Sequence, residues 1–315
     1  MPLQIPRLNF MDCLSPHLEA RKKFAANFSE GLIEYGFVIL MKDGLDRLVS
    51  ENAYRHVRKF FELPNDVKLE FERREIGRQR GYTPIGKERA KQETTSDLKE
   101  FWHTGVEGVA NLPQNQWPTM LPDFRKTQLE LFGYLHSVGS HLMGALELYL
   151  ELDESVLKDM IVGGNSVLRS IHYPKPNADD ANPIWAAEHE DINLMTLLVE
   201  ASGAGLQIKA RNGDWLDVDS QPGEIVVDTG DMFQKLTASL FPAVTHRVVA
   251  PENCKESRYS LPFFIHPKPD TNLSPLRSPK IAPQSMDSEL TAEEYLAKRL
   301  RENGVLTVDF EIDDD

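Results

Sequence analysis

The residues best suited to chemistry form a short run in the second half of the chain, His189-Glu190-Asp191. On an extended segment, side chains two positions apart point to the same side, so His189 and Asp191 can converge on one ion. A third ligand must come from elsewhere, and His246 follows Asp191 by 55 positions (246 − 191), far enough for several intervening strands. Two imidazoles and one carboxylate leave three adjacent coordination positions open. That arrangement suits non-haem Fe(II), which must bind O2 and an organic co-ligand together.

A second pair of residues points to an anion. Arg258 and Ser260 follow His246 by 12 and 14 positions (258 − 246 and 260 − 246) and share one face of a strand by the same alternation. The guanidinium can make a two-pronged contact to a carboxylate, and the hydroxyl adds a third bond. A buried arginine without a partner would cost several kcal/mol, so we expect an anionic partner, either a bound ligand or a structural acid.

The elements that must position these residues are short and rich in β-forming side chains. From about residue 165 onwards, turn signals such as Gln221-Pro222-Gly223 separate a series of short apolar runs. Many short strands with regular turns favour a sandwich or barrel, and a double-sheet jelly roll is among the candidates. The runs are Val167–Tyr173, Met195–Val199, Gly205–Ala210, Trp215–Val218, Glu224–Asp228, Val244–Val249 and Tyr259–Ile265.

The first half of the chain is predicted to be rich in helix. Helical spacing of apolar residues predicts helices over Glu19–Tyr35, Leu45–Phe61 and Pro122–Leu150, and a buried strand over Phe37–Met41. The charged, glycine-containing stretch from Arg73 to Ser96 is predicted to be loop, either a lid or a plain surface loop. A last helix is expected over Thr291–Asn303.

Composition excludes several classes of function. The chain has 315 residues, of which 41% are hydrophobic, enough for a full core. The net charge of −14 argues against nucleic acid and anionic membranes as partners. No apolar run is long enough for a membrane span, the first residues do not form a signal peptide, and the acidic tail at 309–315 is typical of a solvated end. Two cysteines, Cys13 and Cys254, in no metal-binding spacing favour a reducing, cytoplasmic setting. We therefore expect a small-molecule substrate; the sequence does not indicate an oligomeric state.

Taken together, the HxD pair, the second histidine and the RxS pair resemble the isopenicillin N synthase family of Fe(II) dioxygenases, most of which depend on 2-oxoglutarate. The similarity covers roughly residues 4–300. Further matching motifs are Gly36-Phe37, Phe61-Glu62-Leu63-Pro64, Lys68, Gly81-Tyr82, Asp97-Leu98-Lys99-Glu100, Leu168–Pro174, Gly205–Ile208, Asp214-Trp215, Pro222-Gly223 and Gly230-Asp231.

The resemblance implies a mainly β fold, a distorted double-stranded β-helix (jelly roll) flanked by helices. It implies that His189, Asp191 and His246 are the iron ligands, and that Arg258 and Ser260, supported by Tyr173, hold the distal carboxylate of 2-oxoglutarate. The implied reaction consumes O2 and 2-oxoglutarate, releases succinate and CO2, and hydroxylates or desaturates a small organic substrate. We accordingly expect four regions along the chain: an N-terminal helix-rich region (1–105), a helical connection that packs on the core (106–160), the dioxygenase core (161–270) and a C-terminal helix with the acidic tail (271–315).

Some residues depart from the plant-type pattern. Ile171 stands where an Asn is usual, Ala238-Ser239 follow Thr237 where Asn-Gly is usual, and Ser260–Phe264 look closer to isopenicillin N synthase itself. That enzyme uses no 2-oxoglutarate, and its RxS pair grips a substrate carboxylate. A 2-oxoglutarate-independent Fe(II) oxidase is therefore one alternative, although this chain's last glutamine is Gln284, well before its end. A non-catalytic jelly-roll protein with a structural metal is the other, and its weakness is that such sites prefer four ligands rich in cysteine.

Further side chains near these motifs are placed by alternation. Phe264 and His266 share the face of Arg258 and should border the substrate, whereas His172 should point away from the site. Met232 and Gln234 are placed on a strand after Gly230-Asp231, facing either the cavity or the core.

Overall fold

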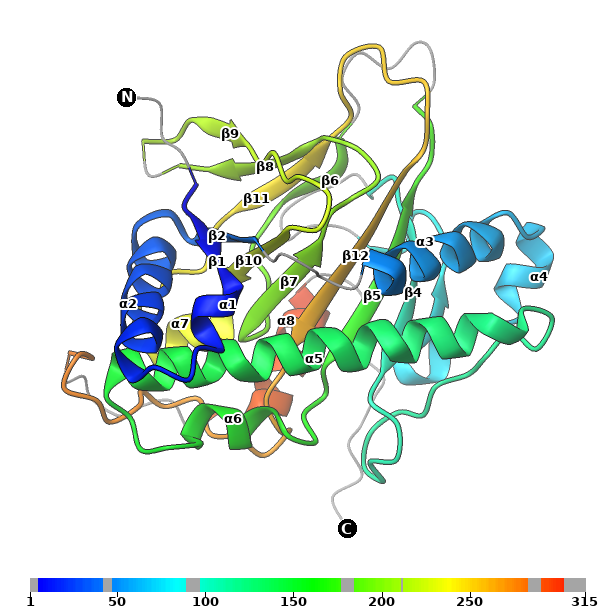
Figure 1. Ribbon diagram of the computed structural model, residues 1–315. Coiled ribbons are helices and arrows are strands. Elements are labelled where there is room, and N and C mark those ends of the chain that lie inside the picture. Colours follow the sequence, from blue (N-terminus) through cyan, green and yellow to red (C-terminus); the bar gives the residue numbers. More distant parts are fainter. Residues whose placement is uncertain are drawn as a thin grey trace.

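The computed structural model describes residues 5–41, 47–88, 97–176, 184–210, 212–282 and 290–302. Two facing β-sheets form the centre of the molecule (Figure 1). The larger sheet has eight strands in the order β1-β2-β10-β7-β12-β5-β4-β3, and the smaller has four in the order β6-β11-β8-β9. Apart from the parallel pair β1 and β2, neighbouring strands run antiparallel. This is the distorted double-stranded β-helix, or jelly roll, that the sequence predicts.

Eight of the twelve strands in the described segments coincide with the apolar runs predicted from the sequence, and β1, β3, β4 and β6 were not predicted as strands. The larger sheet contains β1 (Arg7–Asn9), β2 (Phe37–Met41), β3 (Gly81–Thr83), β4 (Glu100–Gly105), β5 (Val167–Tyr173), β7 (Met195–Val199), β10 (Ile225–Thr229) and β12 (Arg258–Ile265). The smaller sheet contains β6 (Ile184–His189), β8 (Leu206–Lys209), β9 (Trp215–Asp217) and β11 (His246–Val249).

Helices cover the outer face of the larger sheet (Figure 1). They are α1 (Phe10–Cys13), α2 (Leu18–Tyr35), α3 (Arg47–Phe61), α4 (Asn65–Leu69), the 3₁₀ turn η1 (Arg74–Ile76), α5 (Pro122–Leu150) and α6 (Val156–Ile161). The long helix α5 runs across this face, where the ring of Phe132 meets Phe263 of β12 at 4.9 Å between centroids. No helix of the described segments is both long and apolar enough to cross a membrane.

Side chains along β5 and β12 alternate between the hydrophobic core on one face of the sheet and the cavity on the other. Leu168, Leu261 and Phe263 are buried in the core cluster that includes the inward face of α5. Arg169, Tyr173, Arg258 and Ser260 point the other way, into a cavity between the two sheets. One face of each strand therefore supplies stability, and the opposite face supplies the site.

Two sequence expectations are wrong. The stretch from Arg73 to Ser96, expected to be loop, contains the 3₁₀ turn η1 and the strand β3, which pairs with β4. Met232 and Gln234 do not lie on a strand but in the short helix α7 (Asp231–Leu236), which begins after Gly230. Met232 and Leu236, four positions apart, both face the core, and Gln234 accepts a hydrogen bond from the amide of Ala243 at 2.7 Å. A short apolar run fits helix and strand alike, and here packing decides. The last helix, α8 (Ala292–Glu302), forms where expected. The expected start of α3 at Leu45, part of the predicted loop, Gln284 and the acidic tail lie outside the described residues.

Candidate metal and 2-oxoglutarate site

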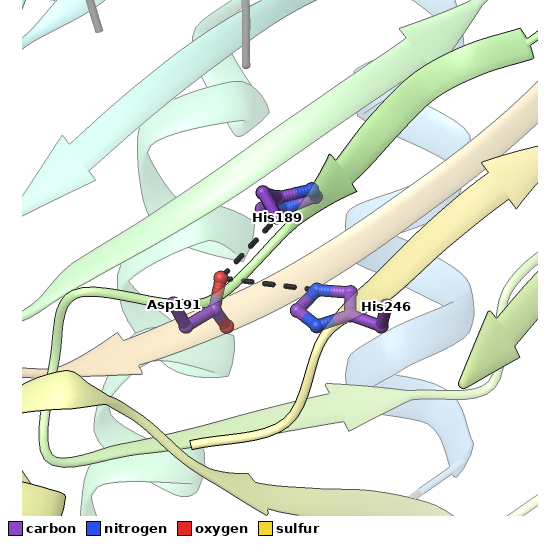
Figure 2. Close-up of side chains that lie close together, drawn as sticks. All are labelled: His189, Asp191 and His246. Atoms are coloured by element: carbon purple, nitrogen blue, oxygen red, sulfur yellow. Dashed lines mark ion pairs between the residues drawn. The ribbon is translucent and has the colours of Figure 1, made fainter. Parts of the chain in front are cut away.

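The three residues expected to bind metal come together between the sheets. His189 ends β6, Asp191 follows it in the next loop, and His246 begins β11 as the register partner of His189 (Figure 2). Oδ1 of Asp191 lies 3.9 Å from Nε2 of each histidine. One ligand atom from each residue falls within 4.8 Å of the others. These separations exceed a hydrogen bond and leave room for one ion among the three atoms.

Neighbouring groups orient each of these side chains. Nδ1 of His189 faces the carbonyl oxygen of Ala187 at 2.7 Å, and Nδ1 of His246 faces that of Val244 at 3.1 Å. A carbonyl only accepts, so each Nδ1 carries the hydrogen, and each Nε2 is left with a lone pair for a metal. Burial, followed by the nearby His246, lowers the pKa of His189 to about 4. His189 is therefore neutral at physiological pH, as a metal ligand must be.

Asp191 is held by a residue that the sequence did not single out. The hydroxyl of Thr196 on β7 donates to Oδ2 of Asp191 and itself accepts from Nδ2 of Asn193 at 2.9 Å. Oδ1 remains free to face the histidines. Asp228 of β10 lies nearby, and burial, followed by the charge of Asp191, raises its pKa well above the usual value.

Arg258, Ser260 and Tyr173 lie together at one end of the cavity. Arg258 and Tyr173 are register partners across β12 and β5, and the guanidinium carbon lies 5.1 Å from the centre of the tyrosine ring. Nε of Arg258 donates to the carbonyl oxygen of Gly203 at 3.0 Å, whereas the buried Nη1 has no partner. Among the described residues no carboxylate pairs with Arg258. The structural acid considered from the sequence is therefore not found there, and a ligand carboxylate fits the free donor.

The cavity has a volume of about 540 Å³ and joins these two groups of residues. Phe264 and His266 line it, as alternation predicts. His172 lies on the opposite face, where it bonds to Glu100 at 2.7 Å and stacks on Tyr259, which confirms the expectation that it points away. Sequence reasoning gave no role at the cavity to several polar residues that line it, among them Arg80, Lys99, His103, Asn165 and Arg169.

Some motif residues of the N-terminal half prove structural. The buried carboxylate of Glu100 receives hydrogen bonds from Lys68 at 2.8 Å and from the hydroxyl of Tyr82. This network ties the segment that follows α3 to β3 and β4, away from the metal ligands. The buried carboxylate of Glu100 thereby gains the partners that a buried charge requires.

Comparisons with known proteins agree with this geometry. Residues 164–267 match the model of the 2OG-Fe(II) oxygenase superfamily, and residues 5–120 match that of the N-terminal region of non-haem dioxygenases in morphine synthesis. A crystal structure of a 2OG-Fe(II) oxygenase family protein from Caulobacter crescentus is 33% identical, with a TM-score of 0.82 over 95% of this chain and 98% of that one. A full-length Neurospora crassa protein, solved in complex with alpha-KG, is 26% identical, with a TM-score of 0.84 over 94% and 95% of the two chains. The 2-oxoglutarate-Fe(II) type oxidoreductase hxnY of Emericella nidulans is 27% identical over 85% of this chain and 81% of its own length.

The chain belongs to the 2OG-Fe(II) oxygenase superfamily. It is an enzyme, a non-haem dioxygenase that uses Fe(II), 2-oxoglutarate and O2 to oxidise a small organic substrate. The main expectation from the sequence is thereby confirmed over the 2-oxoglutarate-independent oxidase and the non-catalytic metal protein.

Proposed function

We propose that His189, Asp191 and His246 together hold the catalytic Fe(II). The observation that carries this proposal is the convergence of Nε2, Oδ1 and Nε2 of these residues, with the opposite atom of each side chain engaged elsewhere. Two nitrogens and one oxygen with no cysteine suit Fe(II) and leave positions for a chelating co-substrate and O2. When bound, the iron supplies activation of O2 coupled to oxidative decarboxylation of 2-oxoglutarate to succinate and CO2.

Arg258 and Ser260, supported by Tyr173, hold the distal carboxylate of 2-oxoglutarate in this proposal. The free Nη1 of Arg258 and the Ser260 hydroxyl belong to adjacent positions of one strand face, so both can reach one carboxylate. Apolar side chains line the cavity around them, namely Ile171, Leu198, Leu206 and Val248. Their contribution is to exclude water, which strengthens the charged contact and protects the oxidising step from side reactions.

Backbone carbonyl oxygens orient the two histidine rings. Because Nδ1 of each is tied to a backbone carbonyl, neither ring can turn away from Asp191 during turnover. The remaining cavity admits the organic substrate beside the iron, where hydroxylation or desaturation takes place.

Turnover of 2-oxoglutarate to succinate in variant proteins tests these roles. We expect His189→Ala, Asp191→Ala and His246→Ala each to abolish succinate formation, and Arg258→Met to raise the concentration of 2-oxoglutarate needed for half-maximal rate. Glu188→Gln is the matched control, because Glu188 is adjacent in sequence but pairs with Lys209 at 3.2 Å. Succinate formation at the wild-type rate in any of the three alanine variants would contradict the metal assignment.

We also assign the enzyme to the cytoplasm. Cys13 and Cys254 are both free thiols, which suits a reducing compartment. Microscopy of a fluorescent fusion tests this assignment, and export of the fusion from the cytoplasm would contradict it.

A further inference from the structure

Two of the basic side chains that line the cavity have no carboxylate partner among the described residues. Among the described residues, six lysines and arginines line the cavity: Arg80, Lys99, Arg169, Lys209, Arg258 and Arg299. Four of them have carboxylate partners. Lys99 pairs with Asp97 and Glu88, Arg169 with Glu88, Lys209 with Glu188 and Arg299 with Asp231, all at 2.8–3.2 Å. Only Arg258 and Arg80 have no such partner in the described part of the chain.

Arg80 is the more deeply buried of these two arginines, with 0% of its surface exposed. Its Nη1 donates to the carbonyl oxygen of Gln79 and its Nη2 to Oδ1 of Asn165, each at 2.7 Å, and its Nε has no partner. Burial lowers the pKa of Arg80 to about 10, so the group still carries its charge at neutral pH. A buried charge held by neutral oxygens alone is costly, and an anion beside it would offset that cost.

A glycine leaves the space that the Arg80 side chain occupies. Arg80 lies against Gly105 at the end of β4, where a Cβ atom would be 2.0 Å from Nε of Arg80. The contact with Asn165 also fixes the direction of that amide. Since Oδ1 accepts from Arg80, Nδ2 points the other way and donates one hydrogen to Oε1 of Gln79 at 3.5 Å. Its second hydrogen is left for a ligand in the cavity, which the half-buried Asn165 lines.

Among the described residues, the surroundings of Arg80 add no compensating negative charge. The charges of Arg80 and Arg169 both act on the buried His266, and burial, ahead of these charges, lowers the pKa of His266 to about 4. Burial likewise keeps the pKa of His103 well below its usual value. Both histidines are therefore neutral, and Glu88 is already shared between Lys99 and Arg169.

This end of the cavity is separate from the end that holds 2-oxoglutarate. Arg80 directly precedes Gly81, whose register partner His103 on β4 pairs in turn with Arg169 on β5. Tyr173, the partner of Arg258, lies four residues further along β5, a rise of about 13 Å. With 2-oxoglutarate placed at Arg258, Arg80 is left for an anion that belongs to a different molecule.

We infer that the organic substrate of this enzyme carries a carboxylate, which binds at the Asn165 amide with the charge of Arg80 directly behind it. This inference rests on the proposed function, because it takes the Arg258 end as the 2-oxoglutarate site. The carboxylate anchors the substrate at one end of the cavity and presents carbons nearer the middle to the iron. Arg80 is thus a specificity-determining residue that acts through Asn165.

The test compares acids with their neutral amides. Wild-type protein with Fe(II) and saturating 2-oxoglutarate, kept anaerobic, is titrated with phenylacetate and phenylacetamide, benzoate and benzamide, and hexanoate and hexanamide. Binding is followed by the change in the visible absorption of the iron complex and by thermal stabilisation. We expect the best acid to bind about tenfold more tightly than its amide, the contribution of one charged hydrogen bond.

Two variants remove the charge in different ways. Arg80→Met deletes it, and Asn165→Asp neutralises it by placing a carboxylate 2.7 Å from Nη2 with no change of shape. Arg80→Met should bring the acid-to-amide ratio to about one, Asn165→Asp, which also removes the amide donor, to one or below, and Arg80→Lys should retain part of the preference. Asn165→Asp also covers the case in which Arg80→Met fails to fold. Arg74→Met, an exposed arginine paired with Glu72, is the control that should change nothing.

The outcomes separate this inference from the proposed function. Affinity for 2-oxoglutarate should be unchanged in Arg80→Met and Asn165→Asp. If 2-oxoglutarate does not bind even the wild-type protein, the proposed function fails, and thermal stabilisation by the acids still reports on Arg80. The inference is overturned if no acid binds, if amides bind as tightly as acids, or if both variants keep the wild-type preference for acids.

Discussion

The hydroxyl of Thr196 donates a hydrogen bond to Oδ2 of Asp191 and so turns Oδ1 toward His189 and His246. The bond joins the loop after β6 to β7 of the opposite sheet, and the metal site therefore depends on how the two sheets face each other. Asn193 completes the chain of bonds by donating to Thr196 at 2.9 Å.

Replacement of Thr196 by valine should weaken iron binding without unfolding the protein. The variant keeps the shape of the side chain but frees the Asp191 carboxylate to rotate, and we expect the dissociation constant for Fe(II) to rise about tenfold. Anaerobic Fe(II) titration measures it. Thr83→Val is the matched control, because the buried Thr83 hydroxyl has no partner to lose. Equal iron affinity of Thr196→Val and wild type would show that the bond does not orient the ligand.

Arg258→Met should weaken 2-oxoglutarate binding strongly. Loss of a buried charged partner costs about 2–5 kcal/mol, so we expect the dissociation constant to rise by about 30-fold or more. Isothermal titration of the anaerobic Fe(II) protein with 2-oxoglutarate measures this. The exposed Arg125, which pairs with Glu107 at 2.8 Å, provides the control variant Arg125→Met. An unchanged affinity in Arg258→Met would place the co-substrate elsewhere.

Gly105 offers a stability test of the Arg80 position. A Cβ atom at Gly105 would lie 2.0 Å from Nε of Arg80, so Gly105→Ala must displace the guanidinium and should destabilise the fold by about 1–3 kcal/mol. Gly133→Ala, on the exposed side of α5 with nothing within 4 Å, should instead stabilise by up to about 1 kcal/mol. Urea unfolding of the two variants measures both effects, and two shifts of the same sign would contradict this packing.

The metal-free protein should lose stability as the pH falls from about 6.5 toward 5. Burial lowers the pKa of both His189 and His266 to about 4, whereas the unfolded chain takes up protons near pH 6.5. The unfolded state then binds more protons in this range, so acidification favours unfolding. Urea midpoints measured in chelator at pH 7, 6 and 5 should decrease, and His266→Gln should show a shallower decrease. If the variant and the wild type lose stability identically as the pH falls, His266 is excluded as a source of this loss.

Local pattern in the sequence accounts for most of the fold. The apolar periodicity of α2 and α5 and the alternation in β5 and β12 are local properties, so their bounds could be predicted almost to the residue. The strand β4 was not predicted, because Glu100, His103 and Thr104 are polar residues whose burial depends on distant partners. The helix α7 was mistaken for a strand because it is only six residues long.

The residues of the candidate site likewise fall into those that the sequence predicts and those that only the structure identifies. His189, Asp191 and His246 follow from spacing, since a period of two and a later strand suffice to bring them together. The roles of Thr196, Arg80 and Asn165 do not follow from spacing, because each is defined by a contact across the cavity or by a missing partner. Such relationships depend on the tertiary structure, and no local signal in the sequence marks them.

The most direct test of the central claim is the visible absorption of the anaerobic protein on addition of Fe(II) and 2-oxoglutarate. We predict that one equivalent of Fe(II) produces a weak charge-transfer band once 2-oxoglutarate is present. The band should be absent in His189→Ala and His246→Ala and retained in Glu188→Gln. A band of full intensity in either histidine variant, or none in the wild-type protein, would contradict the assignment of His189, Asp191 and His246 as the ligands of a 2-oxoglutarate-binding iron.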